Sequence, residues 1–289
     1  MPAGWSSVHT RTDDGVRLAG LHAPGPGGPD THQQFVVCHG MTNATAKPGT
    51  RRVLAEFARY GPVTAFDFRG HGASGGRSTV GDEETADAAA ALHWARDRCA
   101  LPAVLIGFSL GGAVVLRQQG SARRLGTADP VELADVIVSV SAPARWFLRE
   151  SPSMRRVQWL LEHPSGAFIG PRLGIRLGAP WAQVPSTPLQ EVAAIAPTPL
   201  LIVHGTRDHY FDVDQARALH RAAPGSDLLV VDGMGHAESG ISTATMDRIV
   251  SWAQSQVEAQ RQVQRQRAAT ELPHPAGPTG DLAEPGTLG

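Results

Sequence analysis

Short apolar runs alternate along this chain with longer segments whose apolar residues recur at helical spacing. Runs such as 34–40 and 103–108 are bounded by turn residues, which is typical of strands buried in a parallel sheet. By the same criteria we predict further strands at 15–23, 62–68, 133–141, 198–205 and 226–233. Helices are predicted between them at 48–60, 81–99, 110–119, 212–223 and 243–260. This alternation indicates an α/β protein with a doubly wound, mostly parallel sheet.

The alternation is interrupted once, between residues 142 and 190. That stretch is irregular, rich in aromatic residues and broken by six prolines after Pro143. We therefore predict a core formed by 1–141 and 191–267, with 142–190 inserted as a cap or lid. Residues 268–289 are rich in Pro, Gly, Thr and Ala, a composition that cannot bury a core and predicts a disordered tail.

The composition indicates the class of protein but gives no sign of a macromolecular partner. The 289 residues suit one α/β domain with an insertion, and 42% of them are hydrophobic. The 26 basic and 27 acidic side chains leave a net charge of −1, which gives no sign of a nucleic-acid partner. The two cysteines, Cys38 and Cys99, each adjoin an apolar run, which favours free buried thiols over a disulfide framework.

Two features of the sequence concern the cellular location of the protein: the start of the chain and the length of its apolar runs. "MPAGWSSVHTRTDDG" has neither a basic start nor an apolar h-region, so we do not expect a secretory signal. No run approaches the roughly 18 apolar residues of a membrane span. We therefore expect a cytoplasmic protein without stable membrane insertion, present as a monomer or homodimer.

The pentapeptide "GFSLG", residues 107–111, is the first candidate for chemistry. It matches the G-x-S-x-G nucleophile elbow, and it follows a predicted strand and opens a predicted helix, as that motif requires. Such a sharp turn lifts a serine side chain clear of the sheet, and bulkier residues at 107 and 111 would clash with neighbouring elements. The alternative is a glycine-rich turn used only for packing, which the pentapeptide alone leaves open.

A serine hydroxyl needs a base to take its proton, and His236 is the best candidate among twelve histidines. It lies just past the last predicted strand, and Asp208 follows the preceding one, 28 residues earlier. The order Ser109, Asp208, His236 is that of α/β hydrolases, with all three at the sheet edge where such folds bind ligands. Asp212 and Asp214 are rivals of Asp208, but they begin a helix, where aspartate commonly caps.

An acyl-transfer site also needs donors for a developing oxyanion. The turn in "CHGMT", 38–42, would offer the backbone N–H of Met41, and Leu110 after the serine would offer a second. The alternative is that His-Gly merely ends a strand. For the substrate pocket we select two residues of this turn and two aromatic residues of the insertion: His39, Gly40, Trp146 and Trp159.

Five segments in register resemble the α/β-hydrolase superfamily: "VVCHGMT", "FDFRGHGASGG", "LIGFSLGG", "LLIVHGTRD" and "GMGHAE". Within it the loop "DFRGHGASGG" is most similar to that of the serine aminopeptidase and monoglyceride-lipase-like (lysophospholipase-like) hydrolases. The resemblance implies an α/β-hydrolase fold with a helical cap insertion over roughly 15–255. It also implies structural roles for Asp67 and Arg69 beside the elbow.

The leading functional hypothesis is therefore a serine hydrolase of carboxylic esters or thioesters that needs no metal or organic cofactor. A peptidase or amidase with the same triad remains open, although the insertion offers only Glu150 and Glu162 to bind a substrate amine. An acyltransferase or a non-hydrolytic member of the fold also remains open. A haloalkane dehalogenase would need aspartate in place of Ser109.

The charge of the insertion leaves a second question open. Residues 141–190 carry six arginines against two glutamates, interleaved with aromatic residues. They would form either a rim that favours anionic groups on the substrate or an ordinary solvated face over a small core.

Overall fold

The computed structural model describes residues 4–28, 31–126, 132–163 and 165–270. The chain divides into two units, 1–257 and 258–289. In the second unit the described residues, 258–270, are helical and end the helix α9 (Thr243–Thr270). The predicted tail therefore begins within a helix at 268–270, and its remainder, 271–289, lies outside the described residues.

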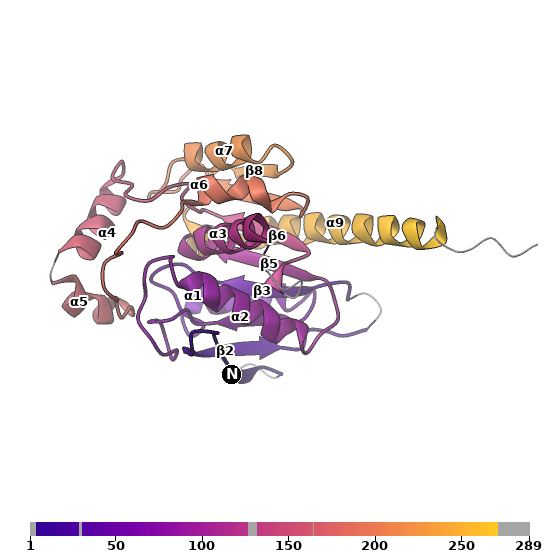
Figure 1. Ribbon diagram of the computed structural model, residues 1–289, viewed down its shortest axis with the longest axis horizontal. Coiled ribbons are helices and arrows are strands. Elements are labelled where there is room, and N and C mark those ends of the chain that lie inside the picture. Colours follow the sequence, from indigo (N-terminus) through magenta and orange to yellow (C-terminus); the bar gives the residue numbers. More distant parts are fainter. Residues whose placement is uncertain (1–3, 29–30, 127–131, 164, 271–289) are drawn as a thin grey trace, which may run out of the picture. The chain divides into compact units, whose positions relative to one another are not determined.

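An eight-stranded sheet forms the centre of the first unit, in the order β1-β2-β4-β3-β5-β6-β7-β8 (Figure 1). Strands β3 to β8 are parallel, whereas β2 pairs antiparallel with both of its neighbours, β4 and β1, at one end of the sheet. The strands are β1 (Ser6–Arg11), β2 (Arg17–Ala23), β3 (Gln34–Cys38), β4 (Val63–Phe66), β5 (Ala103–Phe108), β6 (Val136–Val140), β7 (Leu200–Gly205) and β8 (Asp227–Val231). The predicted fold class, an α/β hydrolase with a mostly parallel sheet, is confirmed.

Two apolar cores lie on opposite faces of this sheet, because successive strand residues point to opposite sides. On β5, Leu105 belongs to one core, and Val104 and Ile106 belong to the other. The first core is completed by α2 (Glu84–Arg96), α3 (Leu110–Leu125) and α7 (Val213–Ala222). The second is completed by α1 (Pro48–Phe57) and by residues of α9 up to Val257. Burial on both faces explains why the central strands are continuous apolar runs.

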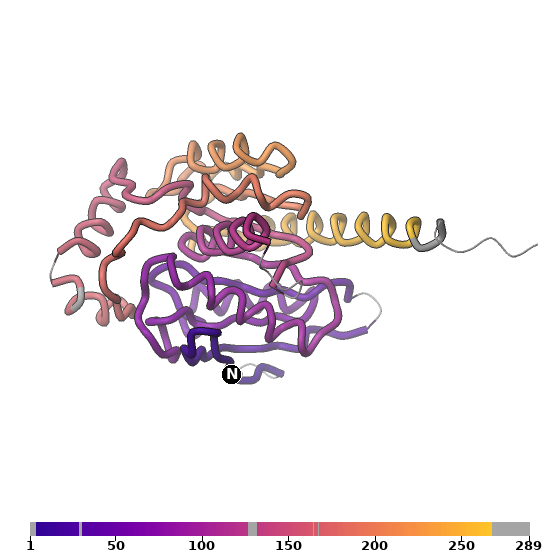
Figure 2. The backbone as a smooth tube through the Cα atoms, in the orientation of Figure 1, coloured from indigo at the N-terminus to yellow at the C-terminus, as the bar shows by residue number. Residues whose placement is uncertain are grey.

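The cap region (residues 142–190) contains helices whose positions the hydrophobic pattern did not predict. They are α4 (Pro152–Glu162), α5 (Gly166–Ile169) and the 3-10 turn η2 (Gly170–Leu173), before α6 (Pro188–Glu191) and the 3-10 turn η3 (Val192–Ile195) return to the core. Pro152 occupies the first turn of α4, where its missing N–H costs nothing, and Ser151 caps that helix. Between η2 and α6 the chain returns without a regular element (Figure 2).

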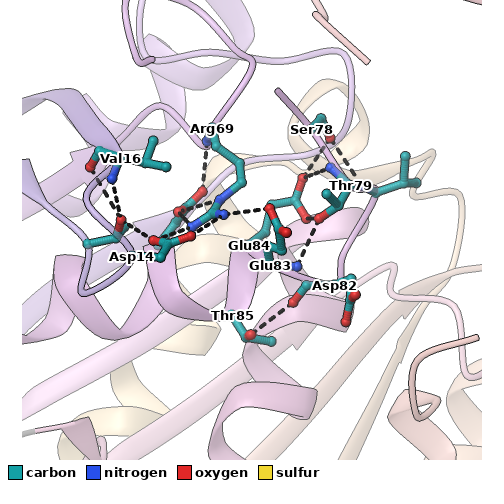
Figure 3. Close-up of polar contacts among 12 residues, drawn as sticks. Asp14, Val16, Arg69, Ser78, Thr79, Asp82, Glu83, Glu84 and Thr85 are labelled. Atoms are coloured by element: carbon teal, nitrogen blue, oxygen red, sulfur yellow. Dashed lines mark hydrogen bonds and ion pairs between the residues drawn. The ribbon is translucent and has the colours of Figure 1, made fainter. Parts of the chain in front are cut away.

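A buried ionic network anchors the loop 67–78 next to the site (Figure 3). Arg69 is 1% exposed, and its guanidinium pairs with Asp14 at 2.7 Å, Glu83 at 2.8 Å and Asp87 at 2.8 Å. The neighbouring Glu84 is fully buried and accepts hydrogen bonds from Ser78 and Thr79. The network therefore joins the turn before β2 and the start of α2 to two residues that line the site cavity.

Asp67, which precedes Arg69 in this loop, makes its contacts through both carboxylate oxygens. It accepts hydrogen bonds from the backbone N–H of Thr45 at 2.6 Å and of Ala73 at 3.0 Å. These bonds join the loop to the segment that follows β3.

Candidate active site

Ser109 lies on a sharp turn between β5 and α3. Its backbone has φ 52° and ψ −115°, a left-handed conformation that non-glycine residues rarely adopt. The hydrogen bond from Ser109 N–H to the Val140 carbonyl, 2.8 Å long, holds the turn against β6. Strain of this kind persists only where surrounding structure fixes it, and it marks a candidate functional position.

Close packing explains why glycine occupies the positions two residues before and two residues after Ser109. A Cβ at Gly107 would lie 2.3 Å from the carbonyl oxygen of Gly111, and one at Gly111 would lie 2.3 Å from that of Cys38. Neither position has room for a side chain, so the close packing of β5, α3 and β3 depends on both glycines.

The structure brings Ser109, His236 and Asp208 together from three different loops. Ser109 Oγ lies 2.9 Å from His236 Nε2, and His236 Nδ1 lies 2.6 Å from Asp208 Oδ2. His236 precedes the short helix α8 (Ala237–Gly240), and Asp208 lies between β7 and α7. If Asp208 accepts the Nδ1 proton, Nε2 is left as the acceptor for the serine hydroxyl.

Asp208 is buried yet ionised. Burial alone would raise its pKa, but the hydrogen bond with His236 and those from the backbone N–H groups of Phe211 and Tyr210 hold the pKa below its ordinary value. An anion here fixes the orientation of the imidazole next to Ser109.

Two backbone N–H groups next to Ser109 are available to a ligand. In the described part of the chain, neither Met41 nor Leu110 donates its N–H to another protein group. Leu110 begins α3, and the first N–H groups of a helix have no partner within the helix. Both residues line the cavity that contains Ser109, as the sequence-based prediction of an oxyanion site requires.

A cavity of about 670 Å³ lies between the cap region and the carboxyl ends of the strands, and Ser109 and His236 form part of its wall. Most of its lining is apolar. The cap contributes Trp146, Leu148, Met154, Val157, Leu161 and Trp181. Of the predicted substrate-binding residues, Gly40 and Trp146 line this cavity.

His39 and Trp159 do not line it, and the structure corrects these two assignments. His39 is 1% exposed: its Nδ1 donates to the Gly40 carbonyl at 2.8 Å, and its Nε2 accepts from Phe68 N–H at 3.0 Å. Burial lowers its pKa to about 4. Trp159 is 52% exposed on the outer side of α4 and stacks on His163, with ring centroids 4.6 Å apart.

Most arginines of the cap region are engaged with protein groups. Arg145 pairs with Glu150 at 2.8 Å, and Arg149 pairs with Glu162 at 2.5 Å. Arg145 is the arginine that lines the cavity, already with its carboxylate partner. Because these arginines are already paired, the contacts favour an ordinary solvated face of the cap region over a rim that binds anionic groups of the substrate.

Glu238 in α8 is a charged cavity residue that was not selected from the sequence. It is 2% exposed, and its carboxylate accepts the Gly40 N–H at 2.7 Å. Burial raises the pKa of this carboxyl above its ordinary value. Its position two residues after His236 was the only signal in the sequence.

Other groups in the described residues offer no alternative centre. Burial raises the pKa of the Cys38 thiol to about 12, which keeps it inert. No group of three His, Cys, Asp or Glu side chains could hold a metal ion, as far as the described residues extend. Nor does any described helix have the length and apolar character to cross a membrane.

The chain belongs to the alpha/beta hydrolase family, whose model matches residues 35–251. Among curated proteins it is similar to the uncharacterized protein YfhR of Escherichia coli O157:H7. The two are 26% identical over 239 residues, which cover 80% of this chain and 74% of that protein.

Solved structures share the fold at low identity. The esterase Pf2001 of Pyrococcus furiosus has a TM-score of 0.61 at 22% identity, covering 88% of this chain and 92% of that one. XC6422 of Xanthomonas campestris, described as an a/b serine hydrolase without lid, has a TM-score of 0.53 at 20% identity, covering 82% and 87%. At these identities the likeness shows that the fold is shared.

Proposed function

We propose that this protein hydrolyses carboxylic esters or thioesters through an acyl-enzyme on Ser109. The observation that carries the proposal is the chain of contacts from Ser109 Oγ to His236 at 2.9 Å and from His236 to Asp208 at 2.6 Å, at the wall of an apolar cavity. A nucleophile, a base and an oriented carboxylate in this order are the parts that acyl transfer requires.

In the first half of the reaction Ser109 Oγ attacks the acyl carbon while its proton passes to His236 Nε2. The carbonyl oxygen becomes an oxyanion that accepts hydrogen bonds from the N–H groups of Met41 and Leu110. When the bond to the leaving group breaks, His236 gives its proton to the departing oxygen or sulfur, and the acyl-enzyme remains.

In the second half His236 takes a proton from water, and the resulting hydroxide attacks the acyl carbon. When the second tetrahedral intermediate breaks down, His236 returns its proton to Ser109 Oγ, and the carboxylic acid is released. Asp208 stays ionised throughout and stabilises the imidazolium in both halves.

The cavity lining supports an apolar acyl group as the substrate's bulk. Leu148, Met154, Val157 and Leu161 offer hydrocarbon surface, which favours burial of an alkyl or aryl chain. Glu162 lines the same cavity but is paired with Arg149, so it is poorly placed to bind a substrate amine. Esters and thioesters therefore fit the site better than aminoacyl substrates.

The test is a panel of p-nitrophenyl esters of increasing acyl length, acyl thioesters and aminoacyl anilides, with the Ser109→Ala variant as control. We expect turnover of esters or thioesters, and a fall in kcat of about 10⁴-fold or more in Ser109→Ala. If the anilides were turned over faster than every ester, the proposed activity would be that of an amidase and not of an esterase. Equal rates in wild type and Ser109→Ala would refute the proposal.

A further inference from the structure

Glu238 is a buried acid in the site that the proposed reaction does not use. Its carboxylate lies 2.7 Å from the Gly40 N–H, and the Asn43 side chain also hydrogen-bonds to it. The nearby Arg52 guanidinium donates instead to the backbone carbonyls of Glu238 at 2.7 Å and Ile241 at 2.8 Å. Burying a carboxylate among backbone and amide donors is costly, so its presence at this point calls for a local reason.

Several contacts orient the turn after β3: the Met41 carbonyl lies 2.6 Å from His71 Nε2, and both the N–H and the carbonyl of Gly40 are hydrogen-bonded. The Gly40 carbonyl accepts from His39 Nδ1 at 2.8 Å and from the Asn43 N–H at 3.0 Å. Because a trans peptide places its C=O and N–H on opposite sides, the Met41 N–H points away from those donors. Glu238 therefore fixes the peptide before Gly40, and His39 and Asn43 fix the peptide that carries the Met41 donor.

The packing around Gly40 is close on the side that faces Glu238 and Ser109. A Cβ at Gly40 would lie 3.2 Å from Glu238 Oε2 and 3.3 Å from the Cβ of Ser109. The carboxylate and the Ser109 side chain thus both border the side of Gly40 on which a side chain would lie. Since Glu238 follows His236 by two residues, the segment that carries the base also reaches the turn that carries the oxyanion donor.

We propose that Glu238 is a positioning residue that holds the Gly40–Met41 turn, so that the Met41 N–H is aimed at the transition-state oxyanion. This inference rests on the proposed hydrolase function. The hydrogen bond joins residues 198 positions apart and makes the alignment of the donor and the base depend on one another. What matters in this role is an acceptor at the position of Oε1, not the negative charge.

The experiment compares Glu238→Gln with Glu238→Asp. The glutamine keeps an oxygen at the reach of Oε1 but loses the charge, whereas the aspartate keeps the charge and withdraws the oxygen by one methylene. Glu191→Gln is the matched control, because Glu191 is also 2% exposed but pairs with Arg124 outside the cavity. Active sites are counted with a fluorophosphonate, so that kcat refers to folded enzyme.

For p-nitrophenyl butyrate we expect kcat to fall about ten- to a hundredfold in Glu238→Asp, with KM changed less than threefold, because only transition-state donation is lost. The affinity for a trifluoromethyl ketone, which forms an oxyanionic adduct, should fall by a similar factor. Glu238→Gln and Glu191→Gln should each stay within about threefold of wild type.

Two results would overturn the inference. Glu238→Asp with wild-type kcat and ketone affinity would show that the contact does not aim the donor. Glu238→Gln impaired as much as or more than Glu238→Asp would show that the charge acts instead, through the His236 imidazolium. An inactive wild type that fails to react with the fluorophosphonate would instead refute the proposed function.

Discussion

The two walls of the cavity are built in contrasting ways. On the sheet side, Ser109, Asp208, His236 and Gly40 are held by backbone and side-chain hydrogen bonds of 2.6–3.1 Å. On the cap side, packing involves a small buried cluster of Leu148, Met154 and Phe211, and ion pairs lie at the surface. The candidate reacting groups are therefore held by hydrogen bonds between polar groups, whereas the cap side of the cavity wall is formed mainly by apolar side chains. Substitutions on the two sides should fail in different ways.

The largest effect is expected on the sheet side, from Asp208→Asn. An amide at this position cannot hold the Nδ1–H tautomer of His236 as the carboxylate does, so kcat should fall about 10⁴-fold with little change in KM. Steady-state kinetics on a p-nitrophenyl ester measures both constants.

Asp212→Asn is the matched control, since Asp212 caps α7 through the Asp214 N–H and was the rival candidate in the sequence. Its kcat should stay within a fewfold of wild type. Comparable losses in the two variants would remove Asp208 from its assigned role.

The next effect is a pH dependence of stability that originates beneath the site. His39 has a folded-state pKa of about 4, against an ordinary value of 6.5, because burial disfavours its charged form. Between these values the unfolded chain binds more protons than the folded one, so the free energy of unfolding falls as pH falls from 6.5 to 4. The contribution of His39 is on the order of 3 kcal/mol across that window.

Urea unfolding of wild type and His39→Gln at pH 7 and pH 4.5 measures this slope. We expect His39→Gln to be less stable than wild type at pH 7 and to lose less stability on acidification. His163→Gln, at an exposed position of the cap region, should leave the slope unchanged. A wild-type stability that does not fall towards pH 4.5, or an equal slope in His39→Gln, would contradict the assignment.

The sheet side was also the more predictable from sequence. Strands buried on both faces leave continuous apolar runs, and Ser109 and Asp208 follow two such strands, β5 and β7. His236 follows β8, which is only half-buried but still reads as a run of apolar residues. β1 was missed because the side chains of Ser6–Arg11 are exposed or half-buried, so no apolar run marks it. Glu238 was missed because its contact, Gly40, is distant in sequence and only the folded chain brings the two together.

On the cap side the local pattern carried less information. The prolines were taken to interrupt structure, yet Pro152 and Pro188 begin helices. Trp159 was predicted to bind substrate, but helix α4 turns it outward and turns Val157 and Leu161 towards the cavity. The rotation of a cap helix depends on what it packs against, which the residues of the helix do not specify alone.

This contrast leads to a test of the cap side. Leu161→Ala should raise KM for a long-chain ester about tenfold, because it removes apolar surface from the cavity wall, and should leave kcat/KM for the acetate within twofold. Trp159→Ala on the same helix is the control and should not change the preference for chain length. The opposite pattern, an effect of Trp159 and none of Leu161, would relocate the acyl site.

The smallest effect is expected at the surface of the cap region. The Arg149–Glu162 pair is exposed on both sides, 58% and 48%, so solvent screens it. A double-mutant cycle with Arg149→Ala and Glu162→Ala should give a coupling energy below about 1 kcal/mol in thermal unfolding. A larger coupling would indicate that the cap is held more tightly than its contacts imply.

The central claim is that Ser109 is a nucleophile activated by His236, and intact-mass measurement after treatment with a fluorophosphonate tests it most directly. Wild type should gain the mass of one phosphonyl group, mapped by peptide fragmentation to Ser109. Ser109→Ala should gain none, and His236→Gln should react at least about 10³-fold more slowly. An unmodified wild type, or an adduct on Ser109 that forms equally fast in His236→Gln, would contradict the account.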